Sequence, residues 1–201
     1  MTNELLSSPA AERNKDPILT VLETVLPASG GVLEIAAGTG QHVCFFASHL
    51  PGLTFQPTEP DPDSRDSMMA RIRAAGLINV SPPIALDVHD ALWPVAGDID
   101  AVLCINMIHI APWSATDSLC RGAARHLRTH GKLVLYGPFR ENGTAVKSNL
   151  DFDASLKRRN PDWGLRDLEE VTHLAAGHGL QRQQVVRMPA NNLTVVFAKS
   201  M

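Results

Sequence analysis

Short apolar runs alternate along the chain with segments in which apolar residues recur every three or four positions. The runs predict buried strands at residues 32–37, 53–58, 83–86, 100–106 and 132–136. The periodic segments predict helices at residues 41–50, 63–75 and 114–127. Strands that carry few polar residues and alternate with helices are typical of a parallel sheet covered on both faces.

The two ends of the chain follow a different rhythm. Residues 16–26 predict a short amphipathic helix with Pro17 in its first turn. The C-terminal part predicts one helix and then two strands, at residues 166–178, 181–186 and 193–198. The short link between these strands implies an antiparallel pair at the sheet edge. We therefore expect one α/β domain over residues 1–201, with a Rossmann-like, mostly parallel seven-strand sheet that ends in this pair.

Two segments lie outside this alternation. Residues 1–15 are expected to form an N-terminal arm. Residues 137–165 form an insertion that has little periodicity and is too long for a simple connector. We expect the insertion to make a lid or an acceptor pocket over the strand ends. A surface loop held by its own hydrogen bonds is the alternative.

Composition narrows the class of protein. The length of 201 residues suits one domain, and 44% hydrophobic with 19% charged residues is ordinary for a soluble globular protein. The net charge is about −3, from 18 basic and 21 acidic side chains. Nucleic-acid binding usually requires clustered basic residues, so no nucleic-acid partner is expected. No apolar run approaches the roughly 20 residues of a membrane span, so no membrane partner is expected.

The cysteines and histidines show no metal-ligand spacing. Cys44, Cys104 and Cys120 each lie in an apolar segment and are expected to be small core residues of a cytoplasmic protein, with a reactive thiol as the alternative. The histidines are not grouped with carboxylates or thiols in a pattern that would hold an ion. We therefore predict no metal.

The first predicted strand runs into a glycine turn, V-L-E-I-A-A-G-T-G-Q-H from Val32 to His42. Glycines after the first strand of a doubly wound sheet let a ligand approach the backbone closely. The dinucleotide fingerprint has a third glycine, which is absent here, and this disfavours an NAD-dependent oxidoreductase. A carboxylate, Glu34, precedes the turn and favours a ligand with a cationic end, such as S-adenosylmethionine.

The stretch E-I-A-A-G-T-G resembles the first motif of the class I (seven-strand) methyltransferases, E/D-x-G-x-G-x-G. The resemblance implies that the turn cups the methionine and ribose of S-adenosylmethionine and that Glu34 orients the ligand amine. The turn residues are Ala36, Gly38, Thr39 and Gly40. Ala36 departs from the family, which often has glycine there; the extra methyl is tolerable if the backbone dihedrals are ordinary.

Further carboxylates follow the next two predicted strands. Glu59 is expected to bind both ribose hydroxyls, with Asp61 as the second choice. Asp87, with Val88 beside it, is expected to meet the adenine amine. Each acid alone is more often an ordinary loop residue. Three of them at the carboxyl ends of successive strands favour a cofactor site.

Longer motifs resemble a domain-of-unknown-function family that includes the methyltransferase-like protein twenty-six of animals. They are Glu12–Asn14, Asn106–Trp113, Tyr136–Phe139, Ser148–Asp153, Pro161–Asp167 and Met188–Leu193. The resemblance covers roughly residues 12–198. It implies the methyltransferase fold and S-adenosylmethionine binding, and it brings no substrate.

The loop after the strand at 100–106 is expected to face the sulfonium and the acceptor. Asn106 and Met107 are assigned to the cofactor, and His109 is the first candidate base because its ordinary pKa lies near neutrality. Tyr136 is the second catalytic candidate. A buried, hydrogen-bonded histidine and a core tyrosine are the alternatives. The candidate acceptor-binding residues are Asn14, Trp113, Asn149, Phe152, Arg166 and Asn191.

These observations together predict S-adenosylmethionine-dependent methyl transfer to a small-molecule acceptor. The reaction is an in-line displacement that leaves S-adenosylhomocysteine, and its main demand on the protein is positioning. A protein methyltransferase and a non-catalytic cofactor-fold protein for binding or assembly are the alternatives. The oligomeric state is left open.

Overall fold

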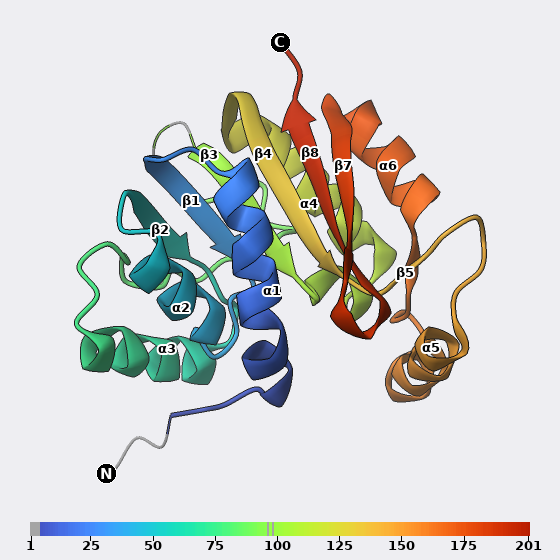
Figure 1. The fold of residues 1–201 in the computed structure, drawn as a ribbon, viewed down its shortest axis with the longest axis horizontal. Coiled ribbons are helices and arrows are strands. Elements are labelled where there is room, and N and C mark those ends of the chain that lie inside the picture. Colours follow the sequence, from blue (N-terminus) through green and yellow to red (C-terminus); the bar gives the residue numbers. More distant parts are fainter. Residues whose placement is uncertain (1–4, 96, 98) are drawn as a thin grey trace.

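The structure is a computed structural model that describes residues 5–95, 97 and 99–201. A six-stranded sheet runs through its centre in the order β2-β1-β3-β4-β8-β7 (Figure 1). The parallel strands are β1 (Gly30–Ile35), β2 (Leu53–Pro57), β3 (Ile99–Ile105) and β4 (Leu127–Gly137). The antiparallel strands are β7 (Leu180–Met188) and β8 (Asn192–Lys199), as the short link between them predicts.

The third of the seven predicted strands, at residues 83–86, does not form in the described part of the chain, so the sheet has six strands. This segment runs beside β2 and makes only isolated parallel bridges, Phe55 with Val80 and Thr58 with Ile84. Two consecutive prolines, Pro82 and Pro83, interrupt it. Since proline has no amide hydrogen, a continuous ladder is impossible there.

Helices cover both faces of the sheet, as the alternation predicts. One face carries α1 (Pro9–Val25), α2 (Gln41–His49) and α3 (Pro62–Ala75), and the other carries α4 (Trp113–His126) and α6 (Leu168–Gly177) (Figure 1). Each face has its own apolar core. The α4 and α6 side packs on Leu33 and Ile35 of β1, and the α1 and α2 side packs on Val32 of the same strand.

The prediction of an N-terminal arm over residues 1–15 is partly wrong. Residues 9–15 belong to α1, which begins two turns earlier than predicted, and residues 1–4 lie outside the described residues. Ser8 caps the helix, because its hydroxyl accepts a hydrogen bond from the amide of Ala11, and Pro9 occupies the first turn. Pro17, expected in the first turn, lies inside the helix.

The insertion is more ordered than its weak periodicity indicates. It contains β5 (Phe139–Arg140) and a 13-residue helix, α5 (Lys147–Arg159). Two residues that follow it, β6 (Arg166–Asp167), pair in parallel with β5. The predicted helix 166–178 therefore starts later, as α6, with Asp167 as its N-cap. The described residues also include two short 3-10 turns, η1 (Met107–His109) and η2 (Pro189–Asn191).

Candidate functional site

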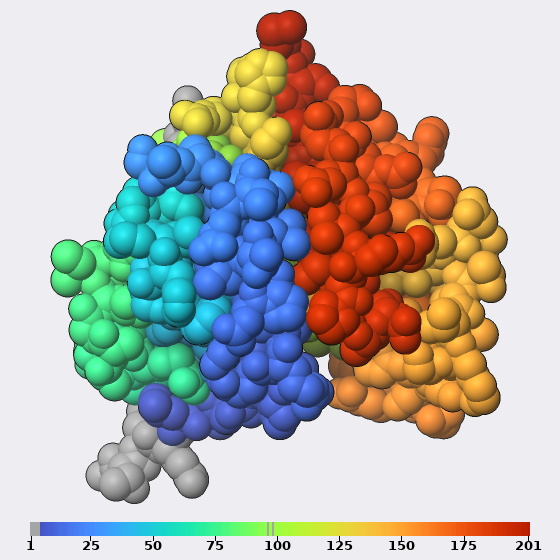
Figure 2. Space-filling model, viewed as in Figure 1, coloured from blue at the N-terminus to red at the C-terminus, as the bar shows by residue number. Residues whose placement is uncertain are grey.

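Strained backbone gathers where the parallel strands end. Six non-glycine residues described by the structure have positive φ, and four of them lie at this edge of the sheet: Ala36, Asn106, Ala190 and Asn191. Such conformations are uncommon for residues with a Cβ, asparagine being among the more tolerant, and strained residues cluster at functional sites. Figure 2 shows the molecular surface hollowed near this edge, between α1 and α5 and below the turn that joins β7 to β8.

The two glycines of the turn have different roles. Gly38 has a φ of 55°, and a Cβ built on it would meet nothing within 4 Å, so the space beside it is open. Gly40 has a φ of 74°, but a Cβ there would come 2.4 Å from Cγ of Met68 in α3. Gly40 is therefore required by packing between α2 and α3, whereas Gly38 leaves room for a ligand.

Ala36 does not have the ordinary dihedrals that would make its methyl harmless. Its φ is 51°, in the left-handed region. A glycine, which the methyltransferase motif often has here, would adopt this conformation without strain. The substitution is therefore tolerated at a cost in stability.

Glu34 is buried in the middle of the sheet, opposite Pro57 of β2 and Leu103 of β3. The residue is 1% exposed, and its Oε2 has no hydrogen-bond partner among the described residues. Burial raises the pKa of this carboxyl from its ordinary value of 4.5 to about 8. A buried oxygen without a partner is open to a donor from a ligand.

Glu59 is fixed at the end of β2. One carboxylate oxygen accepts a hydrogen bond from the amide of Gly38 at 2.9 Å, and the other accepts one from the amide of Asp61 at 3.1 Å. Asp61, the second candidate, instead caps α3, because its Oδ2 accepts a hydrogen bond from the amide of Ser64 at 2.8 Å. The structure thus brings Glu59, rather than Asp61, against the glycine turn.

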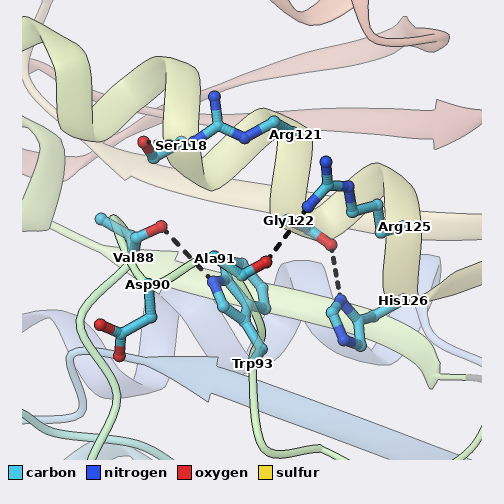
Figure 3. Close-up of a pocket in the computed structure, with 9 residues that line it drawn as sticks. All are labelled: Val88, Asp90, Ala91, Trp93, Ser118, Arg121, Gly122, Arg125 and His126. Atoms are coloured by element: carbon cyan, nitrogen blue, oxygen red, sulfur yellow. Dashed lines mark hydrogen bonds between the residues drawn. The ribbon is translucent and has the colours of Figure 1, made fainter.

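The loop that carries Asp87 and Val88 is held on α4 (Figure 3). The carbonyl of Val88 accepts a hydrogen bond from the indole of Trp93 at 3.4 Å. The indole packs where α4 has Gly122, since a Cβ on this glycine would lie 2.0 Å from Trp93. The cavity beside these residues measures about 10 Å³, about enough for a single water, and is not a cofactor site.

The start of α1 is tied to the start of α2, which the sequence analysis did not foresee. Oε1 of Glu12 accepts a hydrogen bond from Gln41 at 2.6 Å, and Oδ1 of Asn14 lies 2.7 Å from Nε2 of His42. Burial raises the pKa of the Tyr136 phenol, and Asn14 also interacts with this hydroxyl. Asn14 and Tyr136, predicted for different roles, are therefore brought together.

The loop after β3 places His109 beneath the surface. Asn106 has left-handed backbone with a φ of 62°, and its amide donates to the carbonyl of Tyr136 at 2.8 Å. His109 is 1% exposed, and neither ring nitrogen has a hydrogen-bond partner among the described residues. Burial, with the charge of Arg166, lowers the pKa of the imidazole to about 3. His109 is therefore neutral and a weak proton acceptor in this conformation.

Glycine at position 137 makes room for His109, a requirement that the sequence analysis missed. A Cβ on Gly137 would come 2.4 Å from Nε2 of His109. The imidazole also meets Phe139 edge to face, with ring centroids 5.1 Å apart. The glycine at the end of a predicted strand, followed by Pro138, was the available signal.

Arg166 clamps the same loop. Its guanidinium donates to the carbonyls of Ile108 at 2.9 Å and Ala111 at 2.5 Å, and lies 5.7 Å from the ring centroid of Trp113. Burial lowers the pKa of Arg166. The predicted acceptor-binding pair Arg166 and Trp113 therefore lies together, with the arginine bound mainly to backbone.

Polar contacts join the insertion to the β7–β8 turn and also hold the insertion together internally. Nδ2 of Asn149 donates to the carbonyl of Asn191 at 2.9 Å, which joins α5 to the β7–β8 turn. Within the insertion, the buried Asp153 pairs with Arg140 at 2.5 Å and accepts the amide hydrogen of Leu165 at 2.8 Å. Phe152, on the same helix, is exposed.

A larger hollow lies away from the candidate site. It measures about 440 Å³ and is lined by the C-terminal ends of α1 and α2 and the residues that follow them. Among the residues described, no three metal-binding side chains come together as an ion site. No helix in the described ranges has the length and apolar character to cross a membrane.

Solved methyltransferase structures share this fold. An O-methyltransferase family protein from Burkholderia thailandensis matches with a TM-score of 0.80 and 19% identity over 95% of this chain and 57% of its own. Human N-acetylserotonin methyltransferase in complex with S-adenosylmethionine gives 0.79 and 11%, over 96% and 53%. An O-methyltransferase family 2 protein from Planctomyces limnophilus in complex with apigenin gives 0.76 and 16%, over 94% and 61%.

The chain spans little more than half the length of these structures, and at such identity the match shows the fold alone. The α/β architecture expected from the sequence, with its mostly parallel sheet and antiparallel pair, is thereby confirmed as a methyltransferase-type fold. A family model gives the closer relation, since it matches residues 6–199, almost the whole chain. The chain belongs to that family, which is described as Protein of unknown function (DUF938).

Proposed function

We propose that this protein binds S-adenosylmethionine at the carboxyl edge of its sheet and transfers the methyl group to a small-molecule acceptor. The observation that carries the proposal is Glu34, a buried carboxyl with an unpartnered oxygen in the strand that leads to the open turn at Gly38. Glu59 and Asp87 follow on the next two segments. Doubly wound sheets bind their ligands at this edge.

The residues present fit such a cofactor. Glu34 would meet its ammonium group, and Glu59 would accept hydrogen bonds from the ribose hydroxyls while its oxygens stay held by backbone amides. Asp87 would accept from the adenine amine. When bound, S-adenosylmethionine supplies a methyl group on a positively charged sulfur that departs as a neutral thioether.

The chain's contribution to transfer is mainly orientation. Asn106 and Met107 lie at the end of β3, where the loop clamped by Arg166 would fix the approach of an acceptor. His109 stays a proposed base only if a movement of this loop exposes it, because it is buried and its pKa is about 3. Tyr136 is the other proposed group that would orient the acceptor.

The proposed acceptor wall is formed by the insertion, residues 137–165. Three of its cations are paired with carboxylates: Arg140 and Lys157 with Asp153, and Lys147 with Asp151. What it offers is exposed apolar surface, such as Leu150 and Phe152, whereas Asn149 is buried and donates to the carbonyl of Asn191. Methyltransferases of the same fold include one solved with apigenin, which is consistent with a small acceptor.

Titration calorimetry with S-adenosylmethionine and S-adenosylhomocysteine tests the cofactor assignment. We expect micromolar binding and at least about a tenfold loss in Glu59→Ala, since hydrogen bonds to a charged group contribute about 1.5–3 kcal/mol each. Glu59→Gln keeps an acceptor for the Gly38 amide and should lose less. Asp61→Ala, which removes a helix cap, should bind as the wild type does. Absence of binding in the wild type would exclude the function.

Transfer is tested separately with an isotopically labelled methyl donor and metabolite extracts. Label in a small molecule supports the proposal. Label in protein would indicate a protein methyltransferase. Tight cofactor binding without any transfer would indicate a non-catalytic binding protein.

A further inference from the structure

A carboxylate, an imidazole and a hydroxyl form a chain of contacts at the proposed adenine end of the site. Oδ1 of Asp87 accepts a hydrogen bond from the backbone amide of His89 at 2.9 Å and lies 2.8 Å from Nδ1 of the same residue. Nε2 of His89 lies 3.1 Å from Oγ of Ser114, in the first turn of α4. One arrangement of protons satisfies every contact: Nδ1 donates to Asp87, and the Ser114 hydroxyl donates to Nε2.

This chain of contacts leaves one carboxylate oxygen of Asp87, Oδ2, without a hydrogen-bond donor among the described residues. Both donors from His89 reach Oδ1, and no described residue donates to Oδ2. The backbone and side-chain hydrogen bonds from His89 lower the pKa of Asp87, so the group is a carboxylate at neutral pH. An ionised carboxylate whose second oxygen is free is an acceptor for an N–H donor of a ligand.

The backbone around Asp87 is fixed as well. The amide of Asp90 donates to the carbonyl of Asp87 at 2.9 Å, and the amide of Asp87 donates to Oδ2 of Asp90 at 3.1 Å, which closes a tight turn. Beyond the turn, Trp93 packs at Gly122 of α4, and Arg125 donates to the carbonyl of Ala91 at 3.3 Å (Figure 3). Thus α4 holds the loop at several points, of which Ser114 is linked to the carboxylate through His89.

We infer that His89 and Ser114 are positioning residues that aim Oδ2 of Asp87 at the 6-amino group of the adenine ring. The inference rests on the proposed function and gives His89 and Ser114 a role that no sequence motif indicates. A carboxylate held in this way accepts from a 6-amino group and repels a 6-oxo group, so the pair would make the site select adenine over hypoxanthine.

The same order of groups occurs in serine hydrolases. Here, however, the Asp87 side chain is 57% exposed and that of His89 is 44% exposed. Water at such a carboxylate screens its effect on the imidazole, so activation of Ser114 as a nucleophile is disfavoured. A bound adenine would itself cover the carboxylate, which suits a positioning role.

The test compares the affinities of S-adenosylhomocysteine and its 6-oxo analogue, S-inosylhomocysteine, by calorimetry. We expect the wild type to prefer the amino compound by about tenfold or more, in line with one hydrogen bond to a charged group. His89→Ala should lower this ratio by about fivefold, because the freed carboxylate gains acceptor positions and can turn away from the 6-oxo group. Ser114→Ala should lower it by a smaller factor in the same direction.

His173→Ala, which changes an exposed histidine of α6, is the matched control and should leave the ratio unchanged. If the wild type and His89→Ala both bind S-adenosylhomocysteine with the same preference over the analogue, the inference is overturned while the proposed function stands. If the wild type binds neither compound, the proposed function fails first. A ratio that falls in His89→Ala and Ser114→Ala but not in the control supports the assignment.

Discussion

Glu34 links the stability of the fold to pH through a single buried carboxyl group. Its pKa in the folded protein is raised to about 8, whereas the unfolded chain ionises it near 4.5. Between these values the folded protein keeps the proton and the unfolded chain has lost it. The stabilising contribution of the protonated group is therefore full below about pH 4.5 and declines as the pH rises to about 8.

We expect Glu34→Gln to remove this decline, because the amide does not titrate in this range. The free energy of unfolding, measured by urea denaturation at several pH values, should fall less steeply with pH in the variant than in the wild type. Glu23→Gln, at an exposed position of α1, should keep the wild-type slope. Parallel curves for Glu34→Gln and the wild type would show that the carboxyl is not perturbed.

Ala36 stores strain that a glycine would release. Its φ of 51° is unfavourable for a residue with a Cβ by about 1–2 kcal/mol. A glycine would remove this strain, but its greater entropy in the unfolded chain would offset part of the gain in stability. We expect Ala36→Gly to raise the free energy of unfolding by up to about 1 kcal/mol. Ala37→Gly, at a buried neighbour whose φ is not positive, should lower it by about the same amount. A loss of stability in both variants would contradict the strain at Ala36.

At the scale of elements, the packing of the 87–93 loop on α4 depends on Gly122. Alanine usually stabilises a helix by about 1 kcal/mol relative to glycine. Here its Cβ would lie 2.0 Å from Trp93, so we expect Gly122→Ala to lower the free energy of unfolding by about 1–3 kcal/mol. Urea denaturation followed by tryptophan fluorescence measures the change.

Gly177→Ala is the matched control, because a Cβ on the last residue of α6 would meet nothing within 4 Å. It should be neutral or slightly stabilising. Equal effects of the two substitutions would mean that Trp93 does not require the glycine.

The sequence predicts most elements of the fold, and the exceptions have physical reasons. The sequence does not predict the helix α5 because its buried face is partly polar. Asn149 and Asp153 share this face with Leu156, so apolar residues do not recur with the helical period. The sequence predicts the start of α1 too late, because Pro17 also suits a first turn, whereas Ser8 and Pro9 supply the N-cap and first turn of the helix. The prediction of a strand at 83–86 is wrong because the two prolines have no amide hydrogen to donate to a strand ladder.

The sequence predicts which residues belong to the candidate site better than it predicts which segments they contact. Glu34 lies within β1 and Glu59 follows β2, as the sequence indicates, whereas Asp87 follows a segment that forms only isolated bridges. That Gly40 serves packing, or that Arg166 binds backbone carbonyls, depends on segments far apart in the chain and has no local signal. The roles assigned to the site residues stay predictions until ligands are measured.

At the scale of the whole molecule, two apolar cores share one sheet. Cys44 lies in the core under α1 and α2, Cys120 in the core under α4, and Cys104 on β3 faces the latter. Because neighbouring residues of the same strands contribute to both cores, neither layer can separate without exposing the sheet. We therefore expect the two cores to unfold together.

The cysteines provide the measurement. All three thiols are free and buried, and burial raises their pKa values to about 11 for Cys44 and about 12 for Cys104 and Cys120, so native thiolate is scarce. Iodoacetamide should label none of them in native buffer, and all three at one common urea midpoint when each peptide is followed by mass spectrometry. Labelling in concentrated guanidinium chloride gives the reference for full exposure. A lower midpoint for Cys44 than for Cys120 would show instead that the layer of α1 and α2 opens on its own.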